Sequence, residues 1–493
     1  MALTITTKSG DALMASADAI ILPVRAGAGV PAGLDGSDRF NGQLASVLDA
    51  TGFTGKAGQV TAIPTFGKLP ARTLVLAGTG EGDDPALRGE SLRRAYGAAV
   101  KRAEDQGARS VAALLPGGAD ADAVSAVVEG LTLALYRFAR YKSDGEESSK
   151  AVASIELWSS GPVPEGAVAH GQAIAAGVAL ARDLVNTISN DKTPPQIAAW
   201  AQRVARDSGL PCEVLDERAL ASGGYHSILA VGKGSAAPPR LVEMVYEPKG
   251  GATKTVALVG KTITFDSGGL DLKTQDGMYA MKTDMGGGAA VLGAMYAIAQ
   301  IKPNVRVIGI MAAAENMPSG TAMRPSDVVT ALNGKTFEIG NTDAEGRMVL
   351  ADAVTHAARA GADEIIDLAT LTGAKMVALG NIAVAVMGND QGLTDRFIAA
   401  AGNAGERIWQ LPTWDEYKEQ LKSDIADLKS TGGRGGGAII AALFIGEFVE
   451  GKPWIHLDIA GSAATAENGP YTPKGATGVM VRSLVQYVEE AGK

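Results

Sequence analysis

The chain is poor in the residues on which several common enzyme designs depend. Its 493 residues include one cysteine, Cys212, and four histidines, and aromatic residues make up 5%. A single cysteine excludes an intramolecular disulfide and fits a reducing compartment. No histidine pair has the H-E-x-x-H spacing of helical zinc peptidases. No serine lies between glycines two positions away on either side, as the nucleophile elbow of α/β-hydrolases requires.

Long apolar segments and an excess of basic residues are also missing. No run of 18 apolar residues appears, so the sequence predicts no transmembrane helix and no membrane partner. The N-terminal 24 residues lack a basic segment followed by a long apolar one, as a secretory signal would have. A net charge of -9 and a pI near 5.2 argue against a general nucleic-acid surface. We therefore expect a cytoplasmic protein, and we do not expect nucleic acid to be its partner.

The composition, 46% hydrophobic and 20% charged, is that of an ordinary globular protein with two or three domains. We expect an α/β fold: an N-terminal α/β domain at 1–164, a linking helix at 165–188 and a second α/β/α domain at 189–493 with a mixed, mainly parallel sheet. Strands are predicted at 3–7, 19–24, 73–77, 110–115, 154–158, 228–231, 240–246, 255–260, 305–312, 364–369, 382–387 and 455–459. Helices are predicted near 90–107 and 122–142 and at 286–301, 347–360, 393–402 and 437–449, with a solvated loop at 142–150.

The most informative motif is the run NTDAEGR, from Asn341 to Arg347, directly before the predicted helix at 347–360. Its two acids, Asp343 and Glu345, are two positions apart and so cannot share a helix face, where neighbours are three or four apart. They belong to the loop that enters the helix, where both carboxylates can converge on one cation. A capping loop, with the acids in the first turn near the positive end of the helix dipole, explains the motif equally well on its own.

A second cluster lies upstream of the first. The predicted strand at 255–260 leads into KTITFDSGG (261–269), then Lys273, and then MKTDM (281–285) before the predicted helix at 286–301. Ligands bind at the carboxyl ends of strands in open α/β sheets, which is where these acids and lysines fall. The two clusters together supply four carboxylates, whose charge two divalent cations would balance. Oxygen ligands suit Mn²⁺ or Mg²⁺, and Zn²⁺ is tolerated.

Each residue of this cluster also has a simpler interpretation. Lys261 in VGKT could end a phosphate-binding P-loop, but that motif requires glycine where Thr255 stands. Asp266 could be a turn acid, Lys273 a solvated lysine and Asp284 the N-cap of the following helix. These interpretations are individually plausible. Together they are weak, because all the residues of both clusters occur in order and at compatible spacings.

With both clusters in view, the chain resembles the cytosol (leucyl) aminopeptidases, the two-metal peptidases marked by NTDAEGR. The match extends through VGKxITFDSGG, Lys273 and MKTDM, and covers roughly residue 183 to the C-terminus. It implies that 189–493 is a catalytic two-metal peptidase domain. The first 160 or so residues match the family only in size and general pattern. One departure is Thr262, because the family usually has glycine after the ligand lysine, and a hydroxyl there could reposition Lys261.

The resemblance implies a site for two divalent metal ions per subunit. Mn²⁺ is the expected ion, and Zn²⁺ or Mg²⁺ are alternatives. Asp266 and Glu345 would bridge the two ions, and Asp343 would complete one site. Lys261 and Asp284 would complete the other, with Lys261 neutral, which requires a pKa far below its usual value of about 10.4. A nearby dication provides such a shift.

The resemblance also assigns the two cationic residues. Lys273 would stay protonated and stabilise the oxyanion of the tetrahedral intermediate. Arg347 would hold a bicarbonate that serves as general base for attack by a metal-bridging water. Five residues resemble the substrate pocket of the family, although ordinary core packing explains them about equally well. They are Met281, Asn341, Thr370, Leu371 and Gly373.

From these residues we expect a metal-dependent leucyl aminopeptidase that releases N-terminal amino acids, preferably leucine-like ones, from peptides with a free N-terminus. The resemblance implies a homohexamer, and we expect the N-terminal domain to provide oligomer contacts or to shield the site. The alternative is a binding or regulatory protein, for example a DNA-binding one, that keeps the fold with marginal catalysis. The complete set of five ligands and two cationic residues argues against that alternative.

Overall fold

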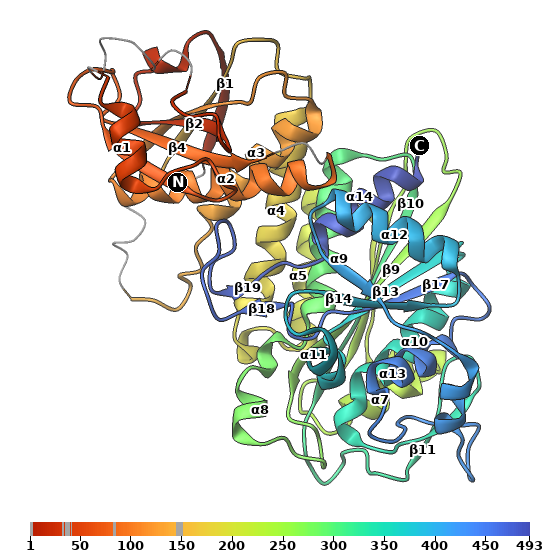
Figure 1. Ribbon diagram of the computed structural model, residues 1–493. Coiled ribbons are helices and arrows are strands. Elements are labelled where there is room, and N and C mark those ends of the chain that lie inside the picture. The colour runs from red at the N-terminus through yellow and green to blue at the C-terminus, as the bar shows by residue number, and fades with distance from the viewer. Residues whose placement is uncertain (1–2, 32–33, 35–39, 41, 82–84, 144–150) are drawn as a thin grey trace. The chain divides into compact units, whose positions relative to one another are not determined.

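The computed structural model describes residues 3–31, 34, 40, 42–81, 85–143 and 151–493. The chain forms two compact units: residues 1–175 with 467–474, and residues 176–466 with 475–493 (Figure 1). The helix expected to link two domains is α4 (Ala167–Asn186), which passes from the first unit into the second. Among the described residues, no helix combines the length and the apolar character needed to cross a bilayer.

The first unit is built on a six-stranded sheet with the order β1-β6-β5-β2-β4-β3. All neighbouring strands are parallel except β3, which is antiparallel to β4. The central strands are buried on both faces, as the apolar side chains of Ile20, Ile21 and Leu74 show. The strands are β1 (Thr4–Ser9), β2 (Ala19–Arg25), β3 (Val60–Pro64), β4 (Thr73–Gly80), β5 (Ser110–Leu114) and β6 (Ser154–Ser159). The helices are α1 (Leu44–Thr51), α2 (Pro85–Asp105) and α3 (Ala121–Ala134).

The second unit is built on an eight-stranded sheet with the order β15-β14-β17-β13-β9-β10-β8-β7. The strands β17, β13, β9 and β10 are parallel to one another, whereas β14, β8 and β7 are each antiparallel to a neighbour. The sheet is therefore mixed and mainly parallel, as expected. Its strands are β7 (Cys212–Leu215), β8 (Arg240–Tyr246), β9 (Thr255–Asp266), β10 (Arg306–Asn316), β13 (Glu364–Ala369), β14 (Val384–Gly388), β15 (Ile408–Gln410) and β17 (Trp454–Asp458).

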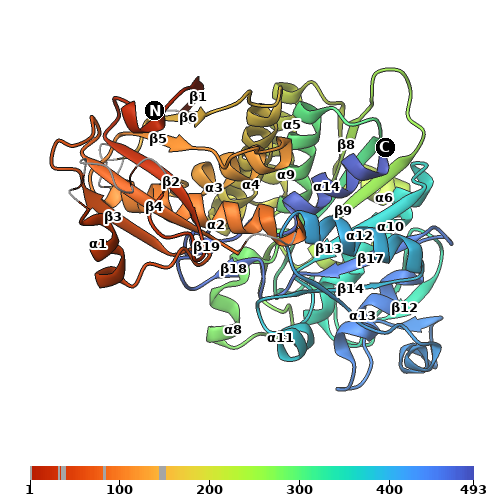
Figure 2. The same cartoon turned by 45° about the horizontal axis from the view of Figure 1, so that its top comes forward.

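Helices cover both faces of this sheet (Figures 1 and 2). One layer contains α9, packed on β9 and β10, with α5 and α14 against it and α12 against α14. The other contains α10, also packed on β9 and β10, with α7 and α13 against it. The helices are α5 (Pro194–Ser208), α7 (His226–Gly232), α9 (Gly286–Ile301), α10 (Glu345–Arg359), α12 (Gln391–Asn403), α13 (Gly437–Gly446) and α14 (Val481–Ala491).

The structure differs from the sequence-based prediction most clearly at three places. The strand expected at 228–231 is helix α7, because a short apolar run fits a buried helix as well as a strand. The Asp352 carboxylate accepts hydrogen bonds from the first backbone N–H groups of that helix, at Ser227 and Ile228. The helix expected at 122–142 ends at Ala134. Strand β9 continues to Asp266, six residues beyond the expected end. Of the loop expected at 142–150, residues 144–150 lie outside the described residues.

Candidate metal centre

The candidate site lies at the carboxyl ends of the central parallel strands of the second unit. Asp266 ends β9, and Asn316 ends the neighbouring β10 in direct register with it. The loop after β9 leads through α8 (Gln275–Tyr279) and the 3₁₀ turn η4 (Met281–Thr283) to Asp284. The turn η5 (Thr342–Ala344) carries Asp343 and leads to Glu345, the first residue of α10. The fold thus brings both sequence clusters to one edge of the sheet.

Three of the expected carboxylate ligands converge on one point. Asp266, Asp343 and Glu345 each offer a carboxylate oxygen, and these oxygens lie within 4.8 Å of one another. Asp266 and Glu345 are buried, and Asp343 is partly exposed. The Oε2 atom of Glu345 is buried and has no hydrogen-bond partner. A buried carboxylate oxygen without a donor is costly unless a cation balances it, so this atom favours a cation site.

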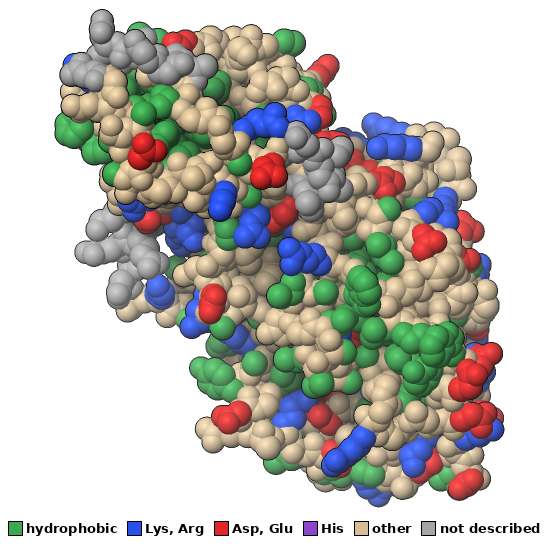
Figure 3. Space-filling model, viewed as in Figure 1, with side chains coloured by type: hydrophobic (Ala, Val, Ile, Leu, Met, Phe, Trp, Pro, Cys, Tyr) green, Lys and Arg blue, Asp and Glu red, His purple; other side chains and the backbone are tan. Residues whose placement is uncertain are grey.

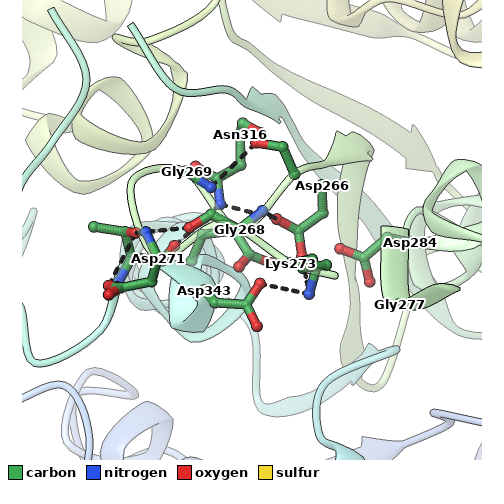
Figure 4. A network of polar contacts seen from close by, with 12 residues as sticks. Asp266, Gly268, Gly269, Asp271, Lys273, Gly277, Asp284, Asn316 and Asp343 are labelled. Atoms are coloured by element: carbon green, nitrogen blue, oxygen red, sulfur yellow. Dashed lines mark hydrogen bonds and ion pairs between the residues drawn. The ribbon is translucent and has the colours of Figure 1, made fainter. Parts of the chain in front are cut away.

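Two lysine ammonium groups lie among the carboxylates. Lys261 Nζ is 2.7 Å from Asp284 Oδ2 and 2.8 Å from Glu345 Oε1. Lys273 Nζ is 2.9 Å from Asp266 Oδ2 and 2.5 Å from Asp343 Oδ1. Figure 4 shows Lys273 between its two carboxylates, with Asp284 nearby on another element. All five expected ligands and Lys273 therefore lie in one cluster.

The pKa values in the cluster are shifted because its acids are buried and close together. Burial, reinforced by the charge of Glu345, raises the pKa of Asp266 to about 6. Burial also raises the pKa of Asp284 well above its usual value and raises that of Asp343. Burial alone would raise the pKa of Glu345, but the charge of Lys261 outweighs it and lowers that pKa. The cluster therefore holds its negative charge only with positive charge beside it.

The pKa of Lys261 is raised in this geometry. Burial would lower it, but the charges of Asp284 and Glu345 outweigh burial. Binding a metal requires the neutral amine, so a metal ion at Lys261 would have to displace its proton. The donor set of four carboxylates and one amine, with an orphaned oxygen on Glu345, fits two divalent cations.

Asn316 holds one of the acids in place and was missed by the sequence-based reasoning. Its Nδ2 donates to Asp266 Oδ1 at 2.9 Å and to the Thr342 backbone oxygen at 3.0 Å. The backbone N–H of Gly268 donates to the same carboxylate oxygen at 2.9 Å. A Cβ at Gly268 would lie 2.4 Å from the Asp271 backbone oxygen, so the tight loop requires glycine. A polar residue at the end of a buried strand was the signal available in the sequence.

Arg347 lies in the first turn of α10, two residues after Glu345, with 8% of its surface exposed. Its Nη1 donates to the backbone oxygen of Ser430 at 2.8 Å, and its Nε is buried without a partner. Burial lowers the pKa of Arg347 to about 10, with Glu345 and Asp458 opposing the shift. The guanidinium therefore stays charged at neutral pH and has an unused donor, which suits a bound anion.

Among the five expected pocket residues, Thr370 touches the cluster directly. Its hydroxyl donates to Asp284 Oδ1 at 2.7 Å, and its backbone oxygen accepts from Lys261 Nζ at 3.0 Å. The Asn341 side chain accepts a hydrogen bond from the backbone N–H of Asp343 at 2.7 Å. Both residues therefore shape the geometry of the cluster as well as its surroundings.

The other three pocket residues lie on neighbouring turns. Met281 begins the turn that ends at Asp284, and its side chain is partly exposed. The backbone N–H of Leu371 donates to Asp458 at 3.2 Å. Gly373 begins the helix α11 (Gly373–Leu379), and a Cβ built on it would meet no atom within 4 Å. Open space beside Gly373 leaves room for a ligand.

Thr262 does not contact the amine of Lys261. It is buried and lies one position along β9 from Lys261, so the two side chains are on opposite faces of the sheet. Its hydroxyl donates to the Gly260 backbone oxygen at 2.9 Å. On that face it packs against α9, where a Cβ at Gly288 would lie 2.0 Å from the Thr262 hydroxyl. Thr262 thus sets how closely α9 approaches the strand.

Lys192 is a fully buried lysine that the sequence-based reasoning did not select. Its Nζ donates to the backbone oxygens of Leu184 and Val185, each at 2.9 Å, and of Lys282 at 2.7 Å. It therefore ties the end of α4 to the turn that carries Asp284.

We expect Lys192→Met to lower the free energy of unfolding by about 2 kcal/mol, because it leaves buried carbonyl groups without a donor. Denaturant unfolding monitored by circular dichroism measures this. Lys233→Met, at an exposed position of the same unit, is the matched control and should be nearly neutral. Equal stability of the Lys192→Met variant and the wild type would show that the three hydrogen bonds contribute nothing.

Comparison with known proteins agrees with this geometry. Residues 179–485 match the model of the catalytic domain of the cytosol aminopeptidase family, and residues 22–145 match the model of its N-terminal domain. The probable cytosol aminopeptidase of Alkaliphilus oremlandii is 44% identical over 463 residues, covering 92% of both chains. That of Geobacter sp. (strain M21) is 46% identical over 455 residues, covering 91% of this chain and 92% of the relative.

Solved structures show the same similarity. The bottromycin maturation enzyme BotP in complex with Mn has a TM-score of 0.86 and 37% identity, and the match covers 97% of this chain and 100% of that one. A mutant of tomato leucine aminopeptidase has a TM-score of 0.89 and 33% identity, with 99% and 97% of the two chains covered. The domain models, the near full-length relatives and the carboxylate cluster agree: the chain belongs to the cytosol aminopeptidase family and is a metal-dependent aminopeptidase.

Proposed function

We propose that this aminopeptidase releases single N-terminal residues, with a preference for leucine-like ones, from peptides with a free N-terminus. One observation carries the proposal: four carboxylates and two lysines from both sequence clusters meet at the carboxyl edge of one sheet. The name of the similar tomato leucine aminopeptidase supports the choice of side chain. Open space beside Gly373 and the partly exposed Met281 are compatible with an apolar side chain next to the cluster.

Five side chains would hold two divalent metal ions. Asp266 and Glu345 would bridge them, Asp343 would complete one site, and Lys261 and Asp284 the other. When bound, such ions supply Lewis acidity and lower the pKa of water so that it attacks at neutral pH. Oxygen ligation favours Mn²⁺, with Zn²⁺ or Mg²⁺ as alternatives, and the similar BotP structure contains Mn. Chelation followed by separate addition of Mn²⁺, Zn²⁺ or Mg²⁺, with leucyl amide hydrolysis as readout, identifies the most effective ion.

The protonated Lys273 would stabilise the oxyanion that forms on the scissile carbonyl. Asp266 and Asp343 raise the pKa of Lys273 although burial opposes them, so the ammonium persists at neutral and mildly alkaline pH. The side chain is only partly exposed, which limits the screening of its charge by water. An ammonium fixed by two carboxylates requires little reorganisation when charge develops on the substrate.

Arg347 would hold a bicarbonate ion that accepts a proton during attack on the peptide bond. We expect Arg347→Ala to lower turnover, but by less than the loss of Lys273, because water can replace the anion as proton acceptor. Its activity should also respond less to added bicarbonate. Measuring initial rates across a bicarbonate series for wild type and variant tests this. Equal activation of the two proteins would remove Arg347 from this role. Arg324→Ala, at a surface ion pair, is the control.

We expect the substrate to need an unprotonated α-amine, because a metal held by Lys261 and Asp284 would bind its lone pair. With a usual α-amino pKa of about 7.7 to 8.0, kcat/KM should rise through that range. N-acetylated peptides should be inert. The comparison is Leu-Gly-Gly with acetyl-Leu-Gly-Gly between about pH 6 and 10. Similar cleavage of both, or internal cuts in a longer peptide, would overturn the exopeptidase assignment.

Three further expectations accompany the function. We propose residues 1–164 as an N-terminal domain, 165–188 as a linking helix and 189–493 as the catalytic domain. We also propose a cytoplasmic homohexamer, in which the N-terminal domain contributes contacts or shields the site. Analytical ultracentrifugation measures the assembly directly. A fully metal-loaded protein without peptidase activity would instead favour the alternative of a binding or regulatory protein.

A further inference from the structure

Strands β9 and β10 pair irregularly where they reach the candidate metal centre. Ala314 pairs with Ile263, but the next pair is Asn316 with Asp266, so the register shifts by one residue between them. With an unbroken register, Asn316 would pair with Phe265. Such irregularities redirect side chains and are common next to active sites. This one places a buried amide beside a proposed metal ligand, although the peptidase chemistry gives that amide no role.

The side chain of Asn316 contacts only one of the two oxygens of the Asp266 carboxylate. Oδ1 accepts hydrogen bonds from Asn316 Nδ2 and from the backbone N–H of Gly268, each at 2.9 Å. Oδ2 lies 2.9 Å from the Lys273 ammonium nitrogen. Figure 4 shows these residues in one network. Neutral donors thus hold one oxygen of the carboxylate, and the other remains for positively charged groups.

The same amide also reaches the second sequence cluster. Asn316 Nδ2 donates to the backbone oxygen of Thr342 at 3.0 Å. Thr342 is the first residue of the turn η5, which continues through Asp343 to Glu345 at the start of α10. Both Asn316 and Thr342 are almost completely buried. One amide group therefore connects the strand end that carries Asp266 to the turn that carries Asp343.

An asparagine suits these two contacts because its amide nitrogen carries two N–H donors and both acceptors are oxygens. Leucine has a similar shape but no donor, and an ionised aspartate would face Asp266 with a second negative charge. Without the donor at position 316, the buried Oδ1 of Asp266 would keep only the hydrogen bond from Gly268. The carboxylate would then be free to take up other orientations.

We propose that Asn316 is a positioning residue that sets the metal affinity of the centre. It fixes the Asp266 carboxylate and holds the two ligand-bearing segments together before a cation binds. The inference rests on the proposed function, in which Asp266 and Asp343 are metal ligands. A ligand that is already ordered loses less conformational freedom on binding, and hydrogen-bond partners of metal ligands change affinity or activity by about 10- to 100-fold.

Mn²⁺ binding to the metal-free, full-length protein tests the proposal, measured by competition with a fluorescent chelator. We expect the apparent Kd for Mn²⁺ to rise by about 10- to 100-fold in Asn316→Leu. Asn316→Ala removes the same donor with a smaller side chain and should change the Kd in the same direction. The Mn²⁺ concentration for half-maximal leucyl amide hydrolysis should rise by a similar factor. Mn²⁺ affinity equal to wild type in both variants would overturn the proposal.

Thr264→Val is the matched control for the packing of the two strands. Thr264 is buried on β9, and its hydroxyl donates to the backbone oxygen of Ala314 on β10 at 3.4 Å. Its loss removes a hydrogen bond between the same strands but no donor to a proposed ligand, so Mn²⁺ should bind as in wild type. Thermal unfolding of the metal-free proteins compares the structural cost of each substitution. Equal weakening of Mn²⁺ binding in Thr264→Val and Asn316→Leu would assign the effect to strand packing and overturn the role of the amide.

Asp266→Ala separates this inference from the proposed function. Wild-type Mn²⁺ affinity in Asp266→Ala would show that the proposed ligand set is wrong, and the role of Asn316 would fall with it. Loss of Mn²⁺ from Asp266→Ala, together with wild-type affinity in the Asn316 variants, would leave the ligand set in place and overturn the role of Asn316 alone. Weakened binding in both positions, with Thr264→Val unchanged, is the expected result.

Discussion

Glu345→Ala is expected to lose both metal ions and to lower kcat/KM by more than a hundredfold. Glu345 is buried, and one of its oxygens pairs with Lys261 while the other has no partner. In the proposed bridging role, this residue would supply a ligand to both ions. Removing even an outer-shell partner of a metal ligand costs about 10- to 100-fold in affinity or activity, and removing a shared ligand should cost more. Metal analysis after dialysis, together with leucyl amide hydrolysis, measures both effects.

The control for Glu345→Ala is Asp271→Asn. Asp271 lies in the loop between Asp266 and Lys273 and is exposed, and its carboxylate accepts hydrogen bonds from Thr342 at 2.7 and 3.1 Å. The Asp271→Asn substitution also removes one negative charge near the cluster, but it removes no proposed metal ligand. We expect this variant to keep both metals. Two bound metals and normal turnover in Glu345→Ala would contradict the bridging assignment, and Asp266→Ala provides an independent check of it.

Lys273→Ala is expected to keep both metals and to lose about a hundred- to a thousandfold in kcat, the usual effect of removing an oxyanion stabiliser. Lys273 pairs with two proposed ligands, Asp266 and Asp343. Because its ammonium competes with cations for these carboxylates, its removal should not weaken metal binding. The combination of full metal content and low turnover distinguishes a catalytic lysine from a structural one.

Steady-state kinetics and metal analysis of the same preparation test the role of Lys273. Lys422→Ala is the control, because Lys422 forms only an exposed ion pair with Glu419. A fall in kcat that tracked a loss of metal would assign Lys273 to the integrity of the site. Turnover close to wild type would exclude it from stabilising the transition state.

Figure 3 shows how charged and apolar side chains are spread over one face of the molecule. In Figure 3 acidic and basic side chains are interspersed, and apolar side chains gather over part of the second unit. The chain as a whole carries 45 Lys and Arg against 54 Asp and Glu.

Cys212 is a cysteine whose surroundings suppress its reactivity. It begins β7 and is partly buried, and burial, with the charge of Glu243, raises the pKa of its thiol to about 11. Such a thiol stays protonated and unreactive at neutral pH. The four histidines likewise lie outside the metal cluster, and His456 pairs with Asp367 inside the sheet.

The sequence by itself determined the fold class and the chemical content of the site. The spacing of apolar residues along the predicted strands and helices indicated a mixed, mainly parallel sheet. The motifs NTDAEGR and KTITFDSGG identified acids and lysines that the structure brings together. Side-chain periodicity carries this information locally, and the ends of parallel strands meet at one edge whatever lies between them.

Only the tertiary structure decided which atoms meet. The support of Asp266 by Asn316 depends on the register between β9 and β10. The partners of Lys261 and Lys273 depend on how the loop after β9 and the start of α10 meet at the edge of the sheet. The extension of β9 to Asp266 and the helical state of 226–232 depend on partners distant in the chain. Local propensity cannot encode such contacts, because the free energy that selects them comes from burial and hydrogen bonds between segments far apart in sequence.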